Sequence, residues 1–281
     1  MSDFAELAAA DAYCRLLAAR HYENFTVASR ILPPSLRLDL VRVYAYCRTT
    51  DDLGDESGHR AAARLVRWRD EVAELFAGGP PVHPVLVALR ETVLQYDLPA
   101  APFLDLVAAN LQDQRVKAYE TWSELAAYCA LSATPVGRIV LRLFGLRQPD
   151  SERLSDDVCV GLQLANFAQD VSRDAARGRR YLLGPEVERL GTAGAVRAHC
   201  DRARGLLASG AALERMASGR LRLQLSLYRL GGLAIVDAIE RVGCETARSR
   251  PRVPAAAKAG LAVRAAMGLR GGTHVASLGP A

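Results

Sequence analysis

The stretch DDVCVGLQLANFAQDVSRDAARGRRY, residues 156–181, combines a helical pattern with a line of polar side chains. Gln163, Asn166, Asp170 and Asp174 follow at steps of three, four and four residues, which places them on one face of a helix. The residues between them are largely apolar, so much of this helix is expected to be buried. Because a buried acid without a partner is costly, this line should meet a cation, a base or water. A polar seam between helices is the alternative interpretation.

The helical spacing of apolar residues continues through most of the chain, as in Leu7, Ala10, Cys14 and Leu17. Alternating strand-like stretches are hard to find, and no sequence period of about 20 to 50 residues repeats. Sandwiches, dinucleotide-binding sheets and solenoids are therefore disfavoured. The sequence predicts an all-α protein.

Proline and glycine mark the expected joints between roughly ten helices. No linker is long enough to separate two domains, so we expect one all-α domain over residues 1–281 with a basic tail from about residue 246. The predicted joints are Pro33–Pro34, Gly78–Pro81, Pro99 with Pro102, Gly145–Pro149, Gly184–Pro185, Gly191 and Arg250–Pro251.

Composition limits the class of protein. Half of the 281 residues are hydrophobic and the net charge is +5, which is typical of a globular chain. No apolar run of about 18 residues predicts a membrane-spanning helix. Acids at Asp3 and Glu6 disfavour a secretory signal, so a cytoplasmic location is expected. The six cysteines form no CxxC pair and the five histidines show no ligand spacing, so they predict neither a disulfide framework nor a zinc site.

A further acidic stretch, YAYCRTTDDLGDE at residues 44–56, ends another helical segment and is the first acidic stretch along the chain; residues 156–181 form the second. Asp51 and Asp55 lie one helical turn apart on the same face. Like charges at this spacing destabilise an isolated helix by roughly 0.2 to 0.5 kcal/mol, so they need solvent, a cation or a base nearby. A solvated helix end is the simpler interpretation.

Two acidic helices in one small protein suggest a shared site for a hard cation. Oxygen ligands without histidine or thiolate favour Mg²⁺, which usually binds one or two carboxylates together with phosphate oxygens of the substrate. Arginines lie beside both acidic stretches and are suited to hold phosphate oxygens in bidentate contacts. They are Arg48, which precedes the acids of the first stretch, and Arg173, Arg177, Arg179 and Arg180 within the second.

These two stretches and the segment from Tyr128 to Gly137 resemble the squalene/phytoene synthase family, over about His21 to Glu240. The resemblance implies the all-α isoprenoid synthase fold, with a central cavity that binds Mg²⁺ and a prenyl diphosphate. By this resemblance, the metal ligands are Asp51, Asp55, Asn166, Asp170 and Asp174. The resemblance also implies that Tyr128 is a pocket tyrosine and that the catalytic residues are this tyrosine and the four aspartates. The substrate contacts that it implies are His21, Tyr44, Arg48, Gln163, Gln169, Arg179 and Tyr181.

Two positions depart from the family pattern. Gln169 stands where an arginine usually precedes the acid that Asp170 matches, and Gly231–Gly232 replaces a tyrosine of the last core helix. The opening HYENFTVASRILP, residues 21–33, and the NFAQDV sequence resemble the hopanoid-pathway branch, which implies conversion of presqualene diphosphate to hydroxysqualene. A head-to-head synthase that makes presqualene diphosphate, squalene or phytoene from farnesyl or other prenyl diphosphates remains the alternative.

Other classes of function fit the sequence less well. Reductive squalene synthesis would require a nicotinamide, and no GxGxxG follows a predicted strand. A basic module for nucleic acid or membranes is suggested by a pI near 9.0, but the acids lie in apolar helices, so no nucleic acid is expected. From Thr246 to Ala281 the chain has six Lys/Arg and no acid. This basic tail predicts peripheral contact with anionic lipid at the inner face of the membrane. An apolar product could pass there to the bilayer or to a neighbouring pathway enzyme. The alternative interpretation is a solvated basic end of the chain.

Overall fold

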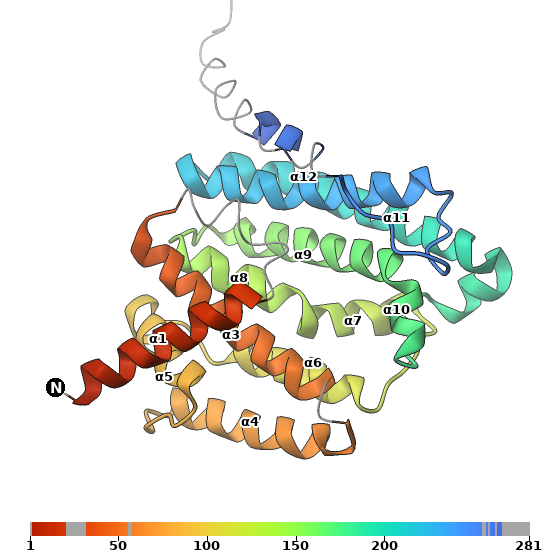
Figure 1. The fold of residues 1–281 in the computed structure, drawn as a ribbon. Coiled ribbons are helices and arrows are strands. Elements are labelled where there is room, and N and C mark those ends of the chain that lie inside the picture. Colours follow the sequence, from red (N-terminus) through yellow and green to blue (C-terminus); the bar gives the residue numbers. More distant parts are fainter. Residues whose placement is uncertain are drawn as a thin grey trace, which may run out of the picture. The chain divides into compact units, whose positions relative to one another are not determined.

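The structure is a computed structural model, and helices dominate it (Figure 1). Within the described ranges the helices are joined by turns and loops and no strand forms, which confirms the all-α prediction. None of these helices is long and apolar enough to cross a bilayer. The chain divides into two compact units, Met1–Cys159 and Val160–Ala281, and the prediction of a single domain stays a prediction. The described residues are 2–20, 32–55, 58–254, 257, 259–261 and 263–265.

The first unit is built around the helix that carries the first acidic stretch. This helix, α3 (Pro34–Asp55), packs against α1, α4, α5, α6 and α8. The first acidic stretch is thus attached to the most connected helix of the unit. The other elements are α1 (Ser2–Arg20), η1 (Gly58–Arg60), α4 (Ala61–Phe76), α5 (Pro84–Tyr96), α6 (Ala101–Asp113), α7 (Trp122–Ser132), α8 (Thr134–Leu143) and the first half of α9 (Pro149–Gln169).

Local sequence sets several of these helix ends. The His83 Nδ1 accepts a hydrogen bond from the Val85 N–H at 3.2 Å and so caps the start of α5. At the start of α7, Thr121 and Glu124 form a reciprocal capping box. Pro135 lies in the first turn of α8, where its missing N–H is not needed. The helix α7 ends at Ser132, just before this proline.

Aromatic packing fixes α3 against α4 and α6. The fully buried Tyr46 stacks on Trp68 at a centroid distance of 5.8 Å and meets Phe103 edge-on at 5.1 Å. The Tyr46 hydroxyl donates to the Phe103 carbonyl at 2.8 Å, and the Trp68 indole N–H donates to the Thr50 hydroxyl at 2.9 Å. Because Thr50 directly precedes Asp51, this packing also fixes the backbone at the first acidic stretch.

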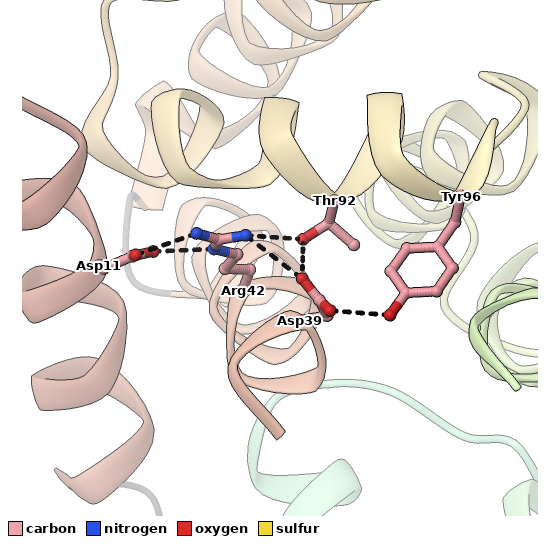
Figure 2. A network of polar contacts seen from close by, with 5 residues as sticks. All are labelled: Asp11, Asp39, Arg42, Thr92 and Tyr96. Atoms are coloured by element: carbon pink, nitrogen blue, oxygen red, sulfur yellow. Dashed lines mark hydrogen bonds and ion pairs between the residues drawn. The ribbon is translucent and has the colours of Figure 1, made fainter. Parts of the chain in front are cut away.

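A buried polar network joins α1 and α5 to α3 (Figure 2). The Arg42 guanidinium donates to the two carboxylate oxygens of Asp11 at 2.8 and 2.9 Å and to Asp39 at 3.2 Å. Asp39 also accepts from the Thr92 hydroxyl at 2.9 Å and the Tyr96 hydroxyl at 3.0 Å. Each buried carboxylate therefore has donors, as a buried charge requires.

The second unit contains the rest of α9, α10 (Val171–Ala176), α11 (Gly184–Met216) and α12 (Gly219–Arg241). The helices α11 and α12 pack along each other (Figure 1). Gly232 of α12 allows this approach, because a Cβ there would lie 3.0 Å from the Leu207 side chain of α11 and 2.7 Å from the Leu162 side chain of α9. Gly191 interrupts α11 at φ 71° and ψ 171°, which confirms the predicted joint at this residue.

Candidate active site

The first acidic set lies in the last turn of α3. Asp51 and Asp55 are one turn apart and exposed, and α3 ends at Asp55 as the sequence predicts. The last carbonyl groups of a helix already carry partial negative charge, so acids here are repelled by the helix as well as by one another. A bound cation would offset both effects.

The helix α6 brings an amide to Asp51. The Asn110 Nδ2 donates to the Asp51 Oδ1 at 3.2 Å, and the Gln114 Nε2 donates to the Gly54 carbonyl at 3.2 Å. A Cβ at Gly54 would lie only 2.5 Å from the Asn110 Oδ1, so glycine is needed for this approach. Sequence reasoning missed Asn110, although the glycine between two acids was a signal of close contact.

The charge of Asp51 is poorly compensated within the protein. Desolvation by surrounding protein atoms raises its pKa to about 6, and the charges of Asp55 and Asp52 add to the increase. The hydrogen bond from Asn110 and the charge of Arg48 lower it again. The Asp51 side chain is nevertheless exposed, so water screens part of this charge. A carboxylate whose negative charge is poorly compensated would be stabilised by a bound cation.

Two other predicted residues lie on the same half of α3. Arg48 forms an ion pair with Asp52 one turn further along the helix, and its side chain is 30% exposed. Tyr44 lies one turn before Arg48 and is half-buried, and desolvation raises the pKa of its phenol. A phenol, a guanidinium and the acidic turn thus follow one another along one stretch of helix.

Tyr128, the predicted pocket tyrosine, is held by a second residue of α6. Its side chain is 4% exposed, and its hydroxyl donates to the Asp113 Oδ2 at 2.9 Å. Asp113 is also buried and lies one turn after Asn110. The helix α6 therefore supports both Asp51 and Tyr128, a link that the sequence pattern did not reveal.

The second acidic set lies where α9 gives way to α10. Asp170 falls between them with φ −100° and ψ 16°, so the helix that the sequence predicts as continuous is interrupted there. The N–H of Asp170 still donates to the Asn166 carbonyl at 2.8 Å, and the N–H of Asp174 donates to the Asp170 carbonyl at 2.9 Å. Asn166, Asp170 and Asp174 therefore still follow one another at intervals of one turn.

The segment after α12 contacts the second acidic set. Arg250 forms an ion pair with Asp170, in which its Nε contacts one carboxylate oxygen and its Nη2 lies 3.3 Å from the other. The Gln169 Nε2 donates to the Pro251 carbonyl at 2.7 Å, and Gln169 is only 4% exposed. Arg173 lies further from Asp170, with 3.8 Å between its Nη1 and the Oδ1. Sequence reasoning did not identify Arg250 as a site residue.

The remaining predicted residues of the second unit differ in exposure. Tyr181 is buried, and its ring stacks on Phe167 at 4.1 Å. Gln163 and Arg179 are half-buried, whereas Asn166 is exposed. His21, the predicted residue nearest the N-terminus, lies outside the described residues.

Comparison with known proteins gives the family. The squalene/phytoene synthase family matches residues 18–257. The chain belongs to the squalene/phytoene synthase family. It is therefore identified as an enzyme of that family, and members of the family are known to use a divalent metal.

Curated relatives of the family cover part of the chain. A presqualene diphosphate synthase from Rhodopseudomonas palustris is 34% identical over 172 residues, which are 60% of this chain and 61% of that protein. A phytoene synthase from Arthrospira platensis is 31% identical over 184 residues, or 60% of this chain and 59% of that protein. The match thus spans less than two thirds of each relative.

Solved structures of the family share the fold. The crystal structure of squalene synthase HpnC from Alicyclobacillus acidocaldarius is 42% identical, with a TM-score of 0.79, and the match covers 85% of this chain and 96% of that one. A dehydrosqualene synthase structure reaches a TM-score of 0.86 over 96% of this chain and 99% of that one at 22% identity. The fold is the all-α isoprenoid synthase fold.

The donor chemistry of the acidic residues fits the divalent metal of the family. In the part of the chain that the structure describes, no three His, Cys, Asp or Glu side chains form a group that could hold a metal by themselves. In each unit taken by itself, the available ligands are carboxylate oxygens at a helix end, and such oxygens suit a hard cation that also binds phosphate oxygens. The two exposed carboxylates of Asp51 and Asp55, one turn apart at the carboxyl end of α3, are the observation that favours a cation in the first set.

Proposed function

We propose that the chain converts presqualene diphosphate and water into hydroxysqualene and diphosphate. The bond between carbon and the diphosphate oxygen breaks, and the resulting cyclopropylcarbinyl cation rearranges. The oxygen of water then bonds to the cation and loses a proton. Nothing is oxidised or reduced in this sequence, so no nicotinamide is required.

The observation that carries this proposal is the residue before Asp170. The family usually has an arginine there, whereas this chain has Gln169, a neutral side chain whose amide is engaged with the Pro251 carbonyl. Condensation of two prenyl diphosphates brings two diphosphates to the enzyme, while the proposed reaction brings one. A neutral residue 169 suits the smaller negative charge. The 42% identity to squalene synthase HpnC, against 31% to the phytoene synthase, supports a squalene-type over a phytoene-type reaction.

Each predicted residue has a defined part in the proposal. Mg²⁺, when bound, stabilises the negative charge of the leaving diphosphate by Lewis-acid and electrostatic action. Arg48 and Arg179 donate hydrogen bonds to the diphosphate, and no nucleophilic side chain is required. The proposed metal ligands are Asp51, Asp55, Asn166, Asp170 and Asp174, and the proposed substrate contacts are His21, Tyr44, Gln163, Gln169, Tyr181 and the pocket residue Tyr128.

Gly231 supports the step in which water adds. Among the residues that the structure describes, and apart from its own helix backbone, a Cβ at this position would meet no atom within 4 Å, and the family usually has a tyrosine in this region. A tyrosine would fill that space, whereas glycine leaves room for a small nucleophile. The apolar walls expected around the cation would keep other water away.

Product analysis tests the proposal. Purified protein with Mg²⁺ is incubated separately with presqualene diphosphate and with farnesyl diphosphate, without nicotinamide, and the products are identified by mass spectrometry. We expect hydroxysqualene from the first substrate and no product from the second. Presqualene diphosphate formed from farnesyl diphosphate would instead establish a condensing synthase.

Substitution of Asp170 tests the metal role separately. Asp170→Asn should lower turnover by roughly a hundredfold or more, because it removes a charged ligand from the site of diphosphate departure. Asp150→Asn is the matched control, because Asp150 is an exposed acid in the first turn of the same helix α9. Near wild-type turnover of Asp170→Asn, with the helical content unchanged by circular dichroism, would refute the metal assignment.

A further inference from the structure

The segment after α12 makes two adjacent contacts with the end of α9. The Gln169 amide holds the backbone at Pro251, and Arg250 pairs with the next residue, Asp170. Residues 169–170 and 250–251 therefore meet as two neighbouring pairs from distant parts of the sequence. The segment from residue 242 returns to the junction of α9 and α10 within the second unit (Figure 1).

The segment is anchored on both sides of its exposed part. Cys244 and Thr246 are completely buried, and Pro251 is buried beside Gln169. Between these anchors, Arg248 and Ser249 are exposed. The backbone is thus fixed, whereas the Arg250 guanidinium stands at the end of a long side chain. It can leave Asp170 by rotation of that side chain alone.

The Arg250 guanidinium contacts the Asp170 carboxylate, the group that would also bind a metal ion. Both carboxylate oxygens of Asp170 face it, and these side chains are only 24% and 22% exposed. The carboxyl end of α9, directly before Asp170, adds its own negative potential. A bidentate pair in this setting competes with any other ligand for the two oxygens.

We infer that Arg250 is a built-in competitor of the divalent cation: its guanidinium pairs with the Asp170 carboxylate, and this ion pair must open before Asp170 can bind the metal. The inference rests on the proposed metal role of Asp170 and adds a control on metal loading. Loading of the second acidic set then depends on exchange of one cation, the guanidinium, for another. Gln169 supports this competition, because its hydrogen bond to the Pro251 carbonyl keeps Arg250 within reach of Asp170.

Metal binding without substrate tests the inference. The binding of Mn²⁺ is followed by the loss of the electron paramagnetic resonance signal of the free ion. Arg250→Gln should bind Mn²⁺ roughly fivefold more tightly than the wild type, because no ion pair has to be broken first. Arg250→Lys retains a charge but not the planar fork, so its affinity should lie between the two.

Arg248→Gln is the matched control, because it removes the same charge from the same segment at an exposed position. The titrations are repeated at about 0.1 M and about 1 M salt, where the Debye length is roughly 10 Å and 3 Å. A long-range field effect would appear in both variants and fade at high salt. Competition at the carboxylate should appear in Arg250→Gln alone and persist.

Asp170→Asn separates the two possible failures. If it weakens Mn²⁺ binding while Arg250→Gln binds like the wild type or like Arg248→Gln, the competition is refuted and the metal role of Asp170 stands. If Asp170→Asn leaves Mn²⁺ binding unchanged, the metal role of Asp170 is refuted, and the competition with it. Thermal unfolding of each variant verifies that it is folded.

Discussion

His199, in α11, is completely buried between two backbone carbonyl groups. Its Nδ1 lies 3.2 Å from the Ala195 oxygen and its Nε2 lies 3.2 Å from the Tyr181 oxygen. A neutral imidazole has one N–H, so these two acceptors and the charge of Glu186 favour the protonated ring. Desolvation and the charge of Arg202 act in the opposite direction and lower the pKa of His199 overall.

This pKa predicts a loss of stability in acid. The unfolded chain, with a histidine pKa of about 6.5, takes up a proton more readily than the folded protein. The contribution of His199 is therefore fully present above that pKa, and the free energy of unfolding falls as the pH decreases through it. His199→Gln cannot be protonated, so its unfolding free energy should fall less between about pH 7.5 and 5.5. Urea unfolding at several pH values measures both slopes.

A second variant of α11 controls for destabilisation alone. Leu207 is completely buried in the same helix and does not titrate, so Leu207→Ala should lower the unfolding free energy at every pH by a similar amount. If His199→Gln retained the full wild-type dependence on pH, the lowered pKa of His199 would be refuted.

At the scale of elements, the buried network predicts how firmly α1 is held to α3. Arg42→Met leaves the buried carboxylates of Asp11 and Asp39 without their arginine, and removal of one partner from a buried pair costs about 3 to 5 kcal/mol. Asp39 keeps its donors Thr92 and Tyr96, so the larger part of the loss should come from Asp11. Chemical unfolding of the variant measures the loss.

A double-mutant cycle isolates this contact. Asp11→Leu removes the carboxylate that Arg42→Met would leave unpaired, so the double variant should be less destabilised than the sum of the two single variants. Additive losses would mean that the contact between α1 and α3 does not depend on this ion pair.

The helices themselves were predictable, whereas their contacts were not. Apolar spacing and proline positions act within a few residues, so the start of α3 at Pro34 and the break before Pro135 follow from local sequence. The contact of Asn110 with Asp51 joins residues 59 positions apart, and that of Arg250 with Asp170 joins residues 80 positions apart. Such pairs depend on how helices pack, which no local pattern contains. The interruption at Asp170 was missed for the same reason.

At the scale of the whole molecule, the distribution of basic residues predicts contact with an anionic membrane surface. The net charge is +5, and six of its basic residues lie from Thr246 onward without any acid. A truncated chain that ends at Pro254 keeps Arg248, Arg250 and Arg252, together with the contact to Asp170, and loses Lys258, Arg264 and Arg270. Most of the deleted part lies outside the described residues.

Flotation with vesicles tests the membrane contact. Each basic residue near an anionic surface contributes about 1 kcal/mol, so loss of three should weaken binding to phosphatidylserine-rich vesicles by roughly a hundredfold. The full chain should float with these vesicles at low salt and should not float with neutral ones, because the attraction is electrostatic and screened. Turnover of presqualene diphosphate in detergent should be equal in both chains, which separates membrane contact from catalysis. Equal flotation of the full and truncated chains would refute the role of the tail and would leave the basic surface of the remaining protein as the membrane-binding part.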